Sequence, residues 1–524
     1  MKDILFSFHN SLKKIFLFFT ILSIFSLFSC TFSERSNIHI SSRDTSWKWE
    51  NGIIVTESPL PPTDQNDVLQ LQTEKLDVVR IGFVGLGTRG RGAINRYVQI
   101  PGVEIKGLCD HEKERTERCQ QILKNNSMPP ASLYDGEEGY KALCERNDVD
   151  LIYIATDWKH HFPVAIYALE HGKHVAIEVP SAMNLKECWA LVDMSEKNRR
   201  HCMILENCCY DWFEMNTLNM VQQGLFGEII YAQGAYIHDL SKIWNRYWKE
   251  NENDLLGWRL DYNMKHRGDL YPTHGLGPIA QVMNIHRGDR MKTLIAMDTE
   301  SFIGKKLVKE RTGKTCSEFR NGDHTVTLIR TEQGKVINIQ HNVMTPQPYS
   351  RSYLLTGTKG MAIKYPIQGY ALDTVPQSSV EDLAYDNLNA HQFLSTENMN
   401  KLIKKYNHPI LKKYGDKALK VGGHGGMDFI MDSRLIYCLQ HGLPLDMDVY
   451  DLAEWCCLAE LGELSMDNHG APVAIPDFTR GKWNHIKGYS HAFASPEEEK
   501  EVEERSLIFT KRLKEKGKKI WSSQ

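Results

Sequence analysis

Residues 78–90 read VVRIGFVGLGTRG, an apolar run that passes directly into the glycine-rich sequence Gly85-Leu86-Gly87-Thr88-Arg89-Gly90. This pattern is typical of a buried strand that turns through a G-x-G-x-x-G loop into a helix. Gly85 allows the tight turn, Gly87 lets backbone approach phosphate oxygens, and Gly90 lets the helix pack on the strand. The helix N-terminus offers free N–H groups to an anion. The sequence therefore predicts a site for the pyrophosphate of a dinucleotide.

A second apolar strand, VEIKGLC at 103–109, ends at Asp110, twenty residues after Gly90. A carboxylate in this position accepts both ribose hydroxyls of NAD. The alternative is an ordinary glycine-rich turn followed by an unrelated Asp. Because the strand, the loop and the acid follow one another at the expected spacing, we expect NAD to be the cofactor.

The alternation of strands and helices continues to about Asn207, through DLIYIAT (150–156), HVAIEVP (174–180) and HCMILEN (201–207). Such βαβ repetition predicts an α/β domain at 78–209, a Rossmann fold with a doubly wound parallel sheet. Each of these strands ends in polar or turn residues. Because ligands bind at the carboxyl ends of such strands, we expect a cofactor crevice there.

The candidate cofactor residues all lie in the loop or at these strand ends. The Arg89 guanidinium can meet pyrophosphate, although a surface side chain on the first helical turn is the alternative. Residues 158–161 should border the adenine ribose or the nicotinamide, unless they only start a helix. Asn207 is a candidate for the nicotinamide ribose or the substrate. The full set is Gly85, Gly87, Thr88, Arg89, Gly90, Asp110, Trp158, Lys159, His160, His161, Glu178, Val179 and Asn207, together with Tyr271 from the second domain.

The pattern changes after Tyr210. Strands with one apolar face follow at 325–331, 335–343 and 351–366, and helices are expected at about 425–440 and 449–466. We therefore predict an α+β domain at 210–490 with an open, mainly antiparallel sheet, one face of which is exposed. Residues 491–524 form a charged tail with a surface helix at 495–519.

The N-terminus carries a different kind of segment. Lys2, Lys13 and Lys14 precede an apolar stretch at 15–28, which closes at Leu27-Phe28-Ser29-Cys30. A membrane span needs roughly 18–20 apolar residues, so residues 1–30 read as a secretion signal instead. The segment resembles a bacterial lipoprotein signal, which implies a lipid on Cys30 and an exported protein anchored in the bacterial envelope. Residues 31–77 are polar and are expected to form a tether.

The bulk composition is that of a globular protein. The chain has 524 residues, 41% hydrophobic and 25% charged, with a net charge of −3. This length predicts two domains with appendages, and this charge gives no reason to expect nucleic acid as a partner. Apart from Cys30, eleven cysteines are scattered without a C-x-x-C pair, so we expect neither a disulfide framework nor a zinc or other metal site.

Several long motifs point to one family. They are Glu206-Asn207-Cys208-Cys209-Tyr210, Tyr236-Ile237-His238-Asp239-Leu240, Leu270-Tyr271-Pro272-Thr273-His274-Gly275, Pro348-Tyr349, Gly423-His424-Gly425-Gly426-Met427-Asp428 and Asp448-Val449-Tyr450-Asp451-Leu452-Ala453. Over nearly all of 78–485 the chain resembles glycoside hydrolase family 109, within the glucose–fructose oxidoreductase and inositol dehydrogenase superfamily. Described members of the family are NAD-dependent α-N-acetylgalactosaminidases.

Two departures from the superfamily favour the hydrolase. Dehydrogenases of the superfamily carry Glu-Lys-Pro, whereas this chain has Glu178-Val179-Pro180 and lacks the lysine. Dehydrogenases also place an Asp four residues before the active-site His, where this chain has Leu270, with Asp269 one step away. The chain is therefore poorly equipped to release an oxidised sugar.

The resemblance also implies the site residues. His274, Tyr271 and Tyr349 are the catalytic candidates, and either Tyr271 or His274 is expected to handle the proton. The alternatives are a structural histidine and, for each tyrosine, interdomain packing. For His424 and Asp428 we expect a hydrogen bond that joins the domains rather than a metal pair. The substrate candidates are Tyr236, Arg259, Tyr271, Pro272, Thr273, His274 and Tyr349.

The family chemistry needs no pair of carboxylates at the scissile bond. The resemblance implies that NAD⁺ takes hydride from the sugar C3, a base removes the C2 proton, the aglycone leaves, water adds, and the hydride returns. The substrate would be a glycan, and the open sheet could pair two copies of the chain. Two alternatives stay open: an exported NAD-dependent sugar dehydrogenase or epimerase, and a non-catalytic glycan-binding lipoprotein.

Overall fold

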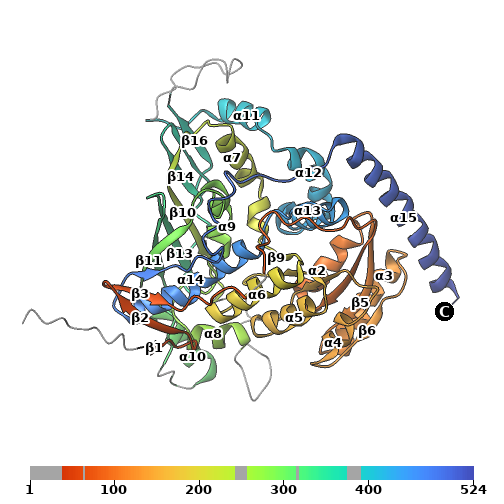
Figure 1. The fold of residues 1–524 in the computed structure, drawn as a ribbon, viewed down its shortest axis with the longest axis horizontal. Coiled ribbons are helices and arrows are strands. Elements are labelled where there is room, and N and C mark those ends of the chain that lie inside the picture. The colour runs from red at the N-terminus through yellow and green to blue at the C-terminus, as the bar shows by residue number, and fades with distance from the viewer. Residues whose placement is uncertain are drawn as a thin grey trace, which may run out of the picture.

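The computed structural model describes residues 38–523 except 63–64, 242–256, 314, 316–317 and 374–390. The predicted signal with Cys30 lies outside the described residues, and so does Cys316. Two sheets organise the chain (Figure 1), a small one at the lower right and a large one at the left. The predicted fold class, a parallel Rossmann sheet followed by an α+β domain, is confirmed.

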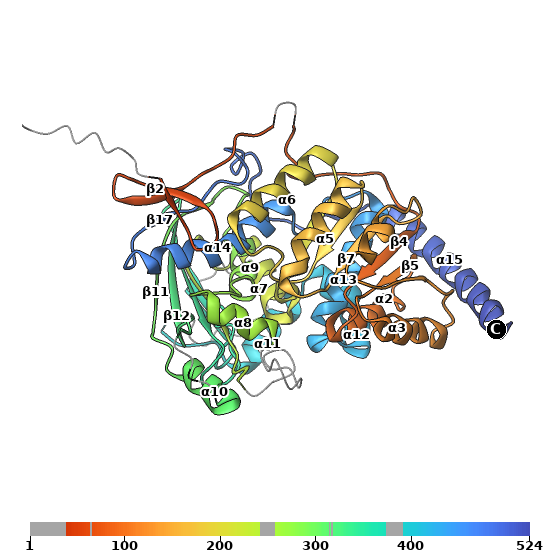
Figure 2. The ribbon, with the colours of Figure 1, turned by 90° about the horizontal axis from the view of Figure 1, so that it is seen from below.

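The small sheet has six strands, and every pairing within it is parallel. Its buried strands are rich in Val, Ile and Leu, as expected for a sheet covered on both faces. In Figure 2, helices α5 and α6 cover one face and α2 and α3 the other. The strands, in spatial order, are β6 (Ser132–Tyr134), β5 (Val103–Cys109), β4 (Val79–Val84), β7 (Leu151–Ile154), β8 (His174–Ile177) and β9 (Cys202–Ile204). The helices are α2 (Thr88–Tyr97), α3 (Lys113–Asn125), α4 (Gly139–Cys144), α5 (Trp158–Glu170) and α6 (Leu185–Asn198).

The large sheet is mixed and mostly antiparallel, with parallel pairs only where β10 meets β13 and where β17 meets β3. One face packs on helices. The other leaves Ile295, Met297 and Leu328 exposed, with Ile295 directly opposite Leu328. The strands, in spatial order, are β1 (His39–Ile40), β2 (Ser46–Glu50), β3 (Ile53–Thr56), β17 (Val473–Ala474), β11 (Met291–Asp298), β12 (Thr325–Thr331), β13 (Val336–Asn342), β10 (Ile229–Ile237), β14 (Leu354–Gly357), β15 (Gly360–Ile363) and β16 (Gly369–Leu372).

The remaining helices fill the space between and around the two sheets. Among them, α14 contacts both α6 of the Rossmann domain and β11 of the large sheet. The second domain contains η1 (Asn207–Tyr210), α7 (Trp212–Gln222), α8 (Trp258–Lys265), α9 (Thr273–Val282), α10 (Ile303–Thr312), α11 (Thr396–Lys405), α12 (Pro409–Val421), η3 (His424–Gly426), α13 (Met427–His441) and α14 (Val449–Asp467).

The prediction of a polar tether at 31–77 is wrong for residues 39–56. They form β1, β2 and β3, and β3 pairs with β17, so the N-terminal segment is the edge of the large sheet. Trp47 and Ile54 are buried there. The sequences SWKWE and IIVT are rich in aromatic and β-branched residues, which favour strands. The polar residues around them hid this strand pattern.

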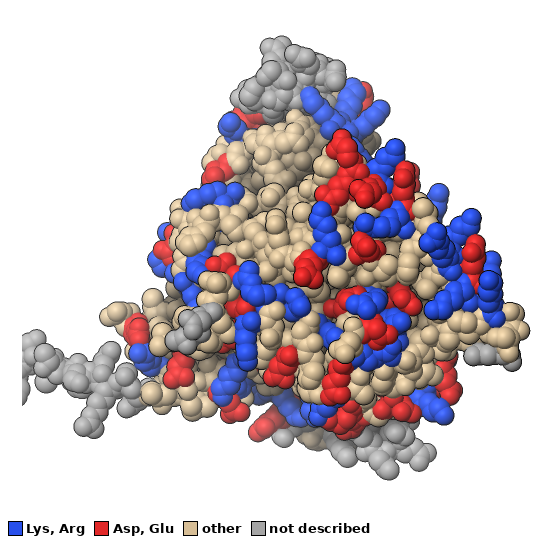
Figure 3. Space-filling view, turned by 45° about the vertical axis from the view of Figure 1, so that its right-hand side comes forward, with Lys and Arg blue, Asp and Glu red and all other residues tan. Residues whose placement is uncertain are grey.

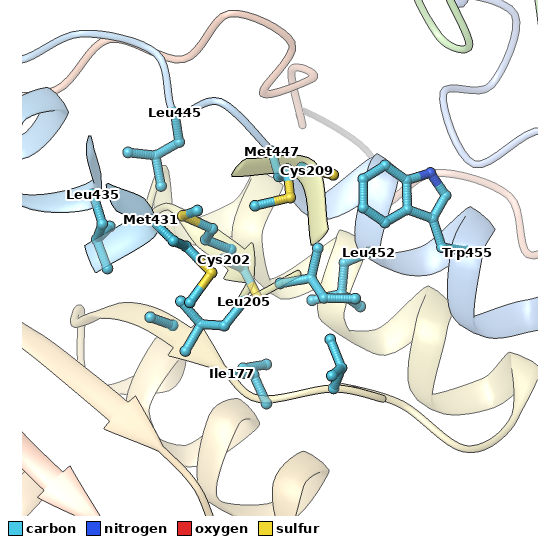
Figure 4. Close-up of a cluster of buried hydrophobic side chains, with 14 of the residues drawn as sticks. Ile177, Cys202, Leu205, Cys209, Met431, Leu435, Leu445, Met447, Leu452 and Trp455 are labelled. Atoms are coloured by element: carbon cyan, nitrogen blue, oxygen red, sulfur yellow. The ribbon is translucent and has the colours of Figure 1, made fainter. Parts of the chain in front are cut away.

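The described cysteines behave as small apolar residues. All ten are buried and unpaired. In Figure 4, Cys202 and Cys209 lie among side chains that include Leu205 and Met431, which come from both domains. The two domains therefore share one continuous core.

The C-terminal helix α15 (Pro496–Ser522) is charged, as predicted, but it is not a free tail. Val502 and Leu513 are buried on it, and the helix contacts α3 and β5. Acidic and basic side chains are interspersed on the face shown in Figure 3. None of the described helices is both long and apolar enough to cross a membrane.

Helix α9 lies against β10 at a place where only glycine fits. A Cβ on Gly275 would stand 2.5 Å from Ala235 N, and one on Gly234 would stand 2.2 Å from Gly275 O. Two glycines thus let the backbones of the helix and the strand touch. This contact places the first turn of α9, with His274, beside the end of β10.

Replacing Gly275 with Ala should therefore lower the free energy of unfolding by about 1–3 kcal/mol, because backbone atoms cannot give way to the new methyl group. Gly462→Ala in α14 is the matched control, since its Cβ would meet Ala296 Cβ at an ordinary 3.8 Å. The control should change stability by less than about 1 kcal/mol. Equal stability of both variants in urea unfolding would contradict the contact.

Candidate active site

The glycine loop has the geometry that its sequence predicts. Gly85 has φ +87°, and a Cβ there would stand 2.5 Å from the backbone of Ala155. A Cβ on Gly90 would stand 1.9 Å from Gly85 O, so helix α2 packs directly on the loop. Gly87 is the N-cap of α2 and supplies no side chain to cap it. The first N–H groups of the helix, beginning at Thr88, are therefore available to an anion.

The space in front of this loop suits the phosphates of a dinucleotide. A Cβ on Gly87 would meet no atom within 4 Å, so the loop faces open space where a phosphate could approach the backbone. Three arginines and one acid line this pocket with the loop itself. The lining residues are Leu86, Gly87, Thr88, Arg91, Glu112, Arg115 and Arg118. Guanidinium groups beside a helix N-terminus suit a pyrophosphate.

Asp110 follows β5 directly, as predicted, and its carboxylate lies beneath the glycine loop. Oδ2 accepts a hydrogen bond from Leu86 N at 2.6 Å, and Oδ1 accepts one from Glu112 N at 3.0 Å. Asp110 therefore holds the shape of the loop. Its contact with ribose stays a prediction.

Arg89 has partners that the sequence did not reveal. Its Nε donates to Glu178 Oε1 at 2.6 Å, and its Nη1 donates to Asp428 Oδ2 at 2.8 Å. Asp428 Oδ1 accepts from Asn207 Nδ2 at 2.6 Å, and Asp428 Oδ2 lies 2.9 Å from His424 Nδ1. The contact between His424 and Asp428 lies within the second domain, whereas the hydrogen bonds of Arg89 and Asn207 to Asp428 join α13 to the Rossmann domain, as expected for this motif. With Arg89 held by carboxylates, Arg91 is the guanidinium that lines the pocket on the same helix.

Residues 158–161 begin α5 and divide into two pairs. Lys159 and His160 are exposed, and His160 Nδ1 lies 2.6 Å from Asp157 Oδ1. Trp158 and His161 are buried, and both His161 ring nitrogens contact backbone carbonyls. Burial lowers the pKa of His161, which keeps the ring neutral. His161 is thus bonded to the backbone, and Trp158 lies beside Arg259 and Tyr271, while the contacts of residues 158–161 with the cofactor stay predictions.

The central pair of the site is His274 and Glu206. His274 stands in the first turn of α9, as predicted, and its Nδ1 lies 2.7 and 2.9 Å from the two carboxylate oxygens of Glu206. Burial alone would raise the pKa of Glu206, but the charge and hydrogen bond of His274 hold it below its ordinary value. The acid is therefore ionised, and Nδ1 donates to it. Glu206 stands in one of the motifs of the sequence, but no residue near it in the chain shows that it faces His274.

An aromatic cluster surrounds His274. The ring of Tyr271 is 4.8 Å and that of Tyr236 is 5.3 Å from the imidazole, both edge-on. The Arg259 guanidinium lies over the rings of Tyr271 and Trp158, at 4.7 and 4.9 Å. Aromatic faces and a guanidinium fork suit the C–H faces and hydroxyls of a sugar. The predicted substrate residues are thus brought together, with Pro272 and Thr273 buried at the start of α9.

Tyr349 joins this cluster through His238. The Tyr349 ring lies 5.0 Å from that of His238, whose Nδ1 is 3.0 Å from Tyr236 Oη. Tyr349 is 41% exposed, so it borders solvent. Burial, helped by the charges of Arg259 and His274, lowers the pKa of His238. His238 is a second imidazole at the site, and the sequence singled it out only within a motif.

Asp269 and Leu270 take places unlike that of a catalytic acid. Asp269 is buried, its Oδ1 accepts from Tyr271 N at 2.9 Å, and burial raises its pKa to about 7. Leu270 packs with Trp158 and Met183. The apolar side chain therefore fills the position where dehydrogenases carry the acid, and Asp269 fixes the backbone of Tyr271.

Glu206, Cys208 and His274 also form a group with ligand atoms within 4.8 Å of one another, which is the spacing of a metal site. The geometry is satisfied without an ion, since Glu206 and His274 bond each other directly. Burial raises the pKa of the Cys208 thiol well above its ordinary value, which disfavours the thiolate that a metal needs. We assign the group to hydrogen bonding.

Two family models match this chain. Residues 79–205 match the oxidoreductase family, NAD-binding Rossmann fold, and residues 210–485 match the C-terminal domain of glycosyl hydrolase 109. Glycosyl hydrolase family 109 protein 5 of Phocaeicola vulgatus is 66% identical over 93% of this chain and 93% of its own length. Protein 4 of the same species is 62% identical over 98% and 99%.

The chain belongs to glycosyl hydrolase family 109. Protein 1 of this family from Bacteroides thetaiotaomicron is 57% identical over 84% of the chain and 93% of its own length. Among solved structures, levoglucosan dehydrogenase in complex with NADH matches with a TM-score of 0.57 and 19% identity over 76% of this chain and 99% of its own. That likeness shows the fold alone.

The family member is thus a glycoside hydrolase that carries an NAD-binding Rossmann domain. The predictions of the family and of NAD as cofactor are confirmed. The individual cofactor and substrate contacts stay predictions, now with defined geometry.

Gly87→Ala tests the cofactor loop. Its φ of −62° suits alanine and its Cβ would meet no protein atom, so stability should change by less than about 1 kcal/mol. The methyl group should occupy space that a pyrophosphate needs, so most NAD should be lost from the purified protein. NAD released on denaturation is the measurement, and Gly92→Ala on the same helix is the control. Wild-type NAD content in Gly87→Ala would place the pyrophosphate elsewhere.

Proposed function

We propose that this member hydrolyses terminal α-linked N-acetylgalactosamine from glycans, with no net oxidation or reduction. The observation that carries the proposal is the Glu206–His274 pair among Tyr236 and Tyr271, at the domain junction beside an NAD-binding domain. Val179 stands where the dehydrogenases of the superfamily carry a lysine. That departure supports a reaction whose oxidised sugar is not released.

Bound NAD would supply a hydride acceptor at the sugar C3 and then return the hydride. His274 is the residue that would accept a proton from the sugar. Because Nδ1 is held as a donor by Glu206, Nε2 is the ring nitrogen that would take the C2 proton of the oxidised sugar. The ionised Glu206 stabilises the imidazolium that forms, as an orienting carboxylate does in other hydrolases.

The tyrosines at the site serve a different role from His274. Burial raises the pKa of Tyr271 well above its ordinary value, against the opposing charge of the Arg259 guanidinium. Burial also raises the pKa of Tyr349. Both hydroxyls therefore stay protonated near neutral pH and donate hydrogen bonds to sugar oxygens. Of the two candidates for the proton acceptor, Tyr271 and His274, we therefore favour His274.

The proposal is tested by denaturing purified protein to identify the released nucleotide, and by assaying aryl α-N-acetylgalactosaminide. We expect released NAD and free N-acetylgalactosamine without net NADH, in the absence of added NAD⁺. Stoichiometric NADH with an oxidised sugar would instead identify a dehydrogenase. Absence of both nucleotide and turnover would identify a glycan-binding protein.

His274→Ala should lower kcat by about 100-fold or more, because no group would hold the transferred proton. Bound NAD should be retained, since His274 lies outside the glycine loop. Glu206→Gln keeps the shape of its partner but removes its charge, so its kcat should fall by about tenfold or more. Glu397→Gln on the exposed side of α11 is the control. Wild-type hydrolysis by His274→Ala would overturn its role.

We also propose that the protein is exported and held by a lipid on Cys30, because residues 1–30 resemble a lipoprotein signal. Loss of membrane association in Cys30→Ser, measured by cell fractionation, is the expected result, and retained association would refute the anchor.

The exposed Ile295, Met297 and Leu328 support pairing of two copies through the open sheet. Sedimentation of a Leu328→Lys variant should show a monomer.

A further inference from the structure

The turn at 41–45, between β1 and β2, is pinned to the interior of the molecule. Its shape is fixed by Ser41 Oγ, which accepts hydrogen bonds from Arg43 N at 3.1 Å and from Thr45 N at 3.0 Å. Ser42 and Asp44 point to solvent, whereas the Arg43 side chain is only 3% exposed. Arg43 therefore enters the protein between two exposed residues of the turn.

Arg43 bridges two elements that lie far from it in sequence. Its Nε donates to Glu463 Oε2 of α14 at 2.9 Å. Its Nη1 donates to Met183 O, in the loop that leads into α6. The guanidinium thus connects the N-terminal strands β1–β3, helix α14 and the Rossmann domain at one point.

Ser41 makes a parallel connection. Its hydroxyl donates to Glu460 Oε1 at 2.7 Å, and Glu460 Oε2 accepts from Leu185 N at 2.7 Å. Arg43 holds Met183 directly, and Ser41 holds Leu185 through Glu460. The loop at 183–185 is therefore fastened at both ends.

This loop lies directly under the candidate active site. It begins three residues after Pro180, which closes the strand end that carries Glu178 and Val179. The Met183 side chain is buried in a cluster with Trp158 and Leu270, and Tyr271 packs against that cluster. A shift of Met183 would therefore move the support of two residues that face the substrate side.

The ion pair between Arg43 of the turn and Glu463 of α14 stays charged. Burial alone would raise the pKa of Glu463, but a hydrogen bond from His266 and the charge of Arg43 hold it at about 2. Arg320 Nη2 also lies 3.1 Å from Glu463 Oε1. Removing Arg43 would therefore leave Glu463 with other partners, so the substitution does not strand a buried charge.

We propose that the turn at 41–45 is a clamp on the candidate active site, and that Arg43 is a positioning residue that acts through Met183 on Trp158 and Tyr271. The clamp precedes both family-matched regions, 79–205 and 210–485. A segment outside the matched domains thus belongs to the working enzyme. The readout in kcat rests on the proposed hydrolase function, whereas the readout in NAD binding does not.

The experiment compares Arg43→Ala, Arg43→Lys and wild type as full-length proteins. In Arg43→Ala we expect kcat to fall about tenfold through misplacement of Tyr271, and the dissociation constant for NAD, measured by equilibrium dialysis, to rise. KM should change less than kcat. Arg43→Lys keeps the charge beside Glu463 and should recover part of both losses. Lys48→Ala, in an exposed pair with Glu50 on β2, is the control and should match wild type.

A lowered melting temperature in Arg43→Ala with unchanged kcat and NAD binding would overturn the proposal, because the contact would then be structural only. If Arg43→Ala does not fold, Ser41→Ala takes its place, since it removes one hydroxyl and leaves the guanidinium. Wild-type kcat and NAD binding in Ser41→Ala would then refute the clamp. If wild type itself releases no sugar, the proposed function fails, and NAD binding alone decides the clamp.

Discussion

The ionised carboxylate of Asp428 holds the cofactor side of the site to the rest of the molecule. It is almost fully buried, yet Arg89, Asn207 and His424 all direct polar groups at it. Burial opposes its charge, but the His424 hydrogen bond and the charges of Arg89 and Arg96 hold its pKa well below the ordinary value. Such a buried network adds little net stability. Here it fixes position, because helix α2, the end of β9 and helix α13 meet at one carboxylate.

Two consecutive residues, Glu206 and Asn207, connect Asp428 to the candidate catalytic histidine. Asn207 bonds Asp428 on the cofactor side, and Glu206 bonds His274 on the substrate side. The proposed phosphate loop and the proposed proton acceptor are thus separated by one peptide unit and three side-chain contacts. The two glycines where α9 touches β10 fix the same imidazole from the other side. The arrangement leaves little freedom between hydride acceptor and proton acceptor, which is the geometry that transfer chemistry needs.

The sequence predicts those parts of the site that depend on local spacing. The glycine loop, the acid after β5 and a histidine in the first turn of a helix are all read from neighbouring residues. What the sequence does not show depends on contacts between distant segments. The hydrogen bond between Arg89 and Asp428, 339 positions apart, cannot be read from the residues around either one, and the contact of Arg89 with phosphate stays a prediction. The strands at 39–56 were hidden because they are short and because β3 joins the large sheet through β17, which lies far along the chain.

The contacts of the turn between β1 and β2 have a consequence for the order of events during synthesis. Arg43 and Glu463 are 420 positions apart, and Ser41 and Glu460 are 419 apart. Closing a loop of that length must wait until α14 exists, and contacts of such range form late in folding. A growing chain that already displays its glycine loop therefore still lacks the support beneath Tyr271. The site as proposed is therefore complete only when nearly the whole chain has been made.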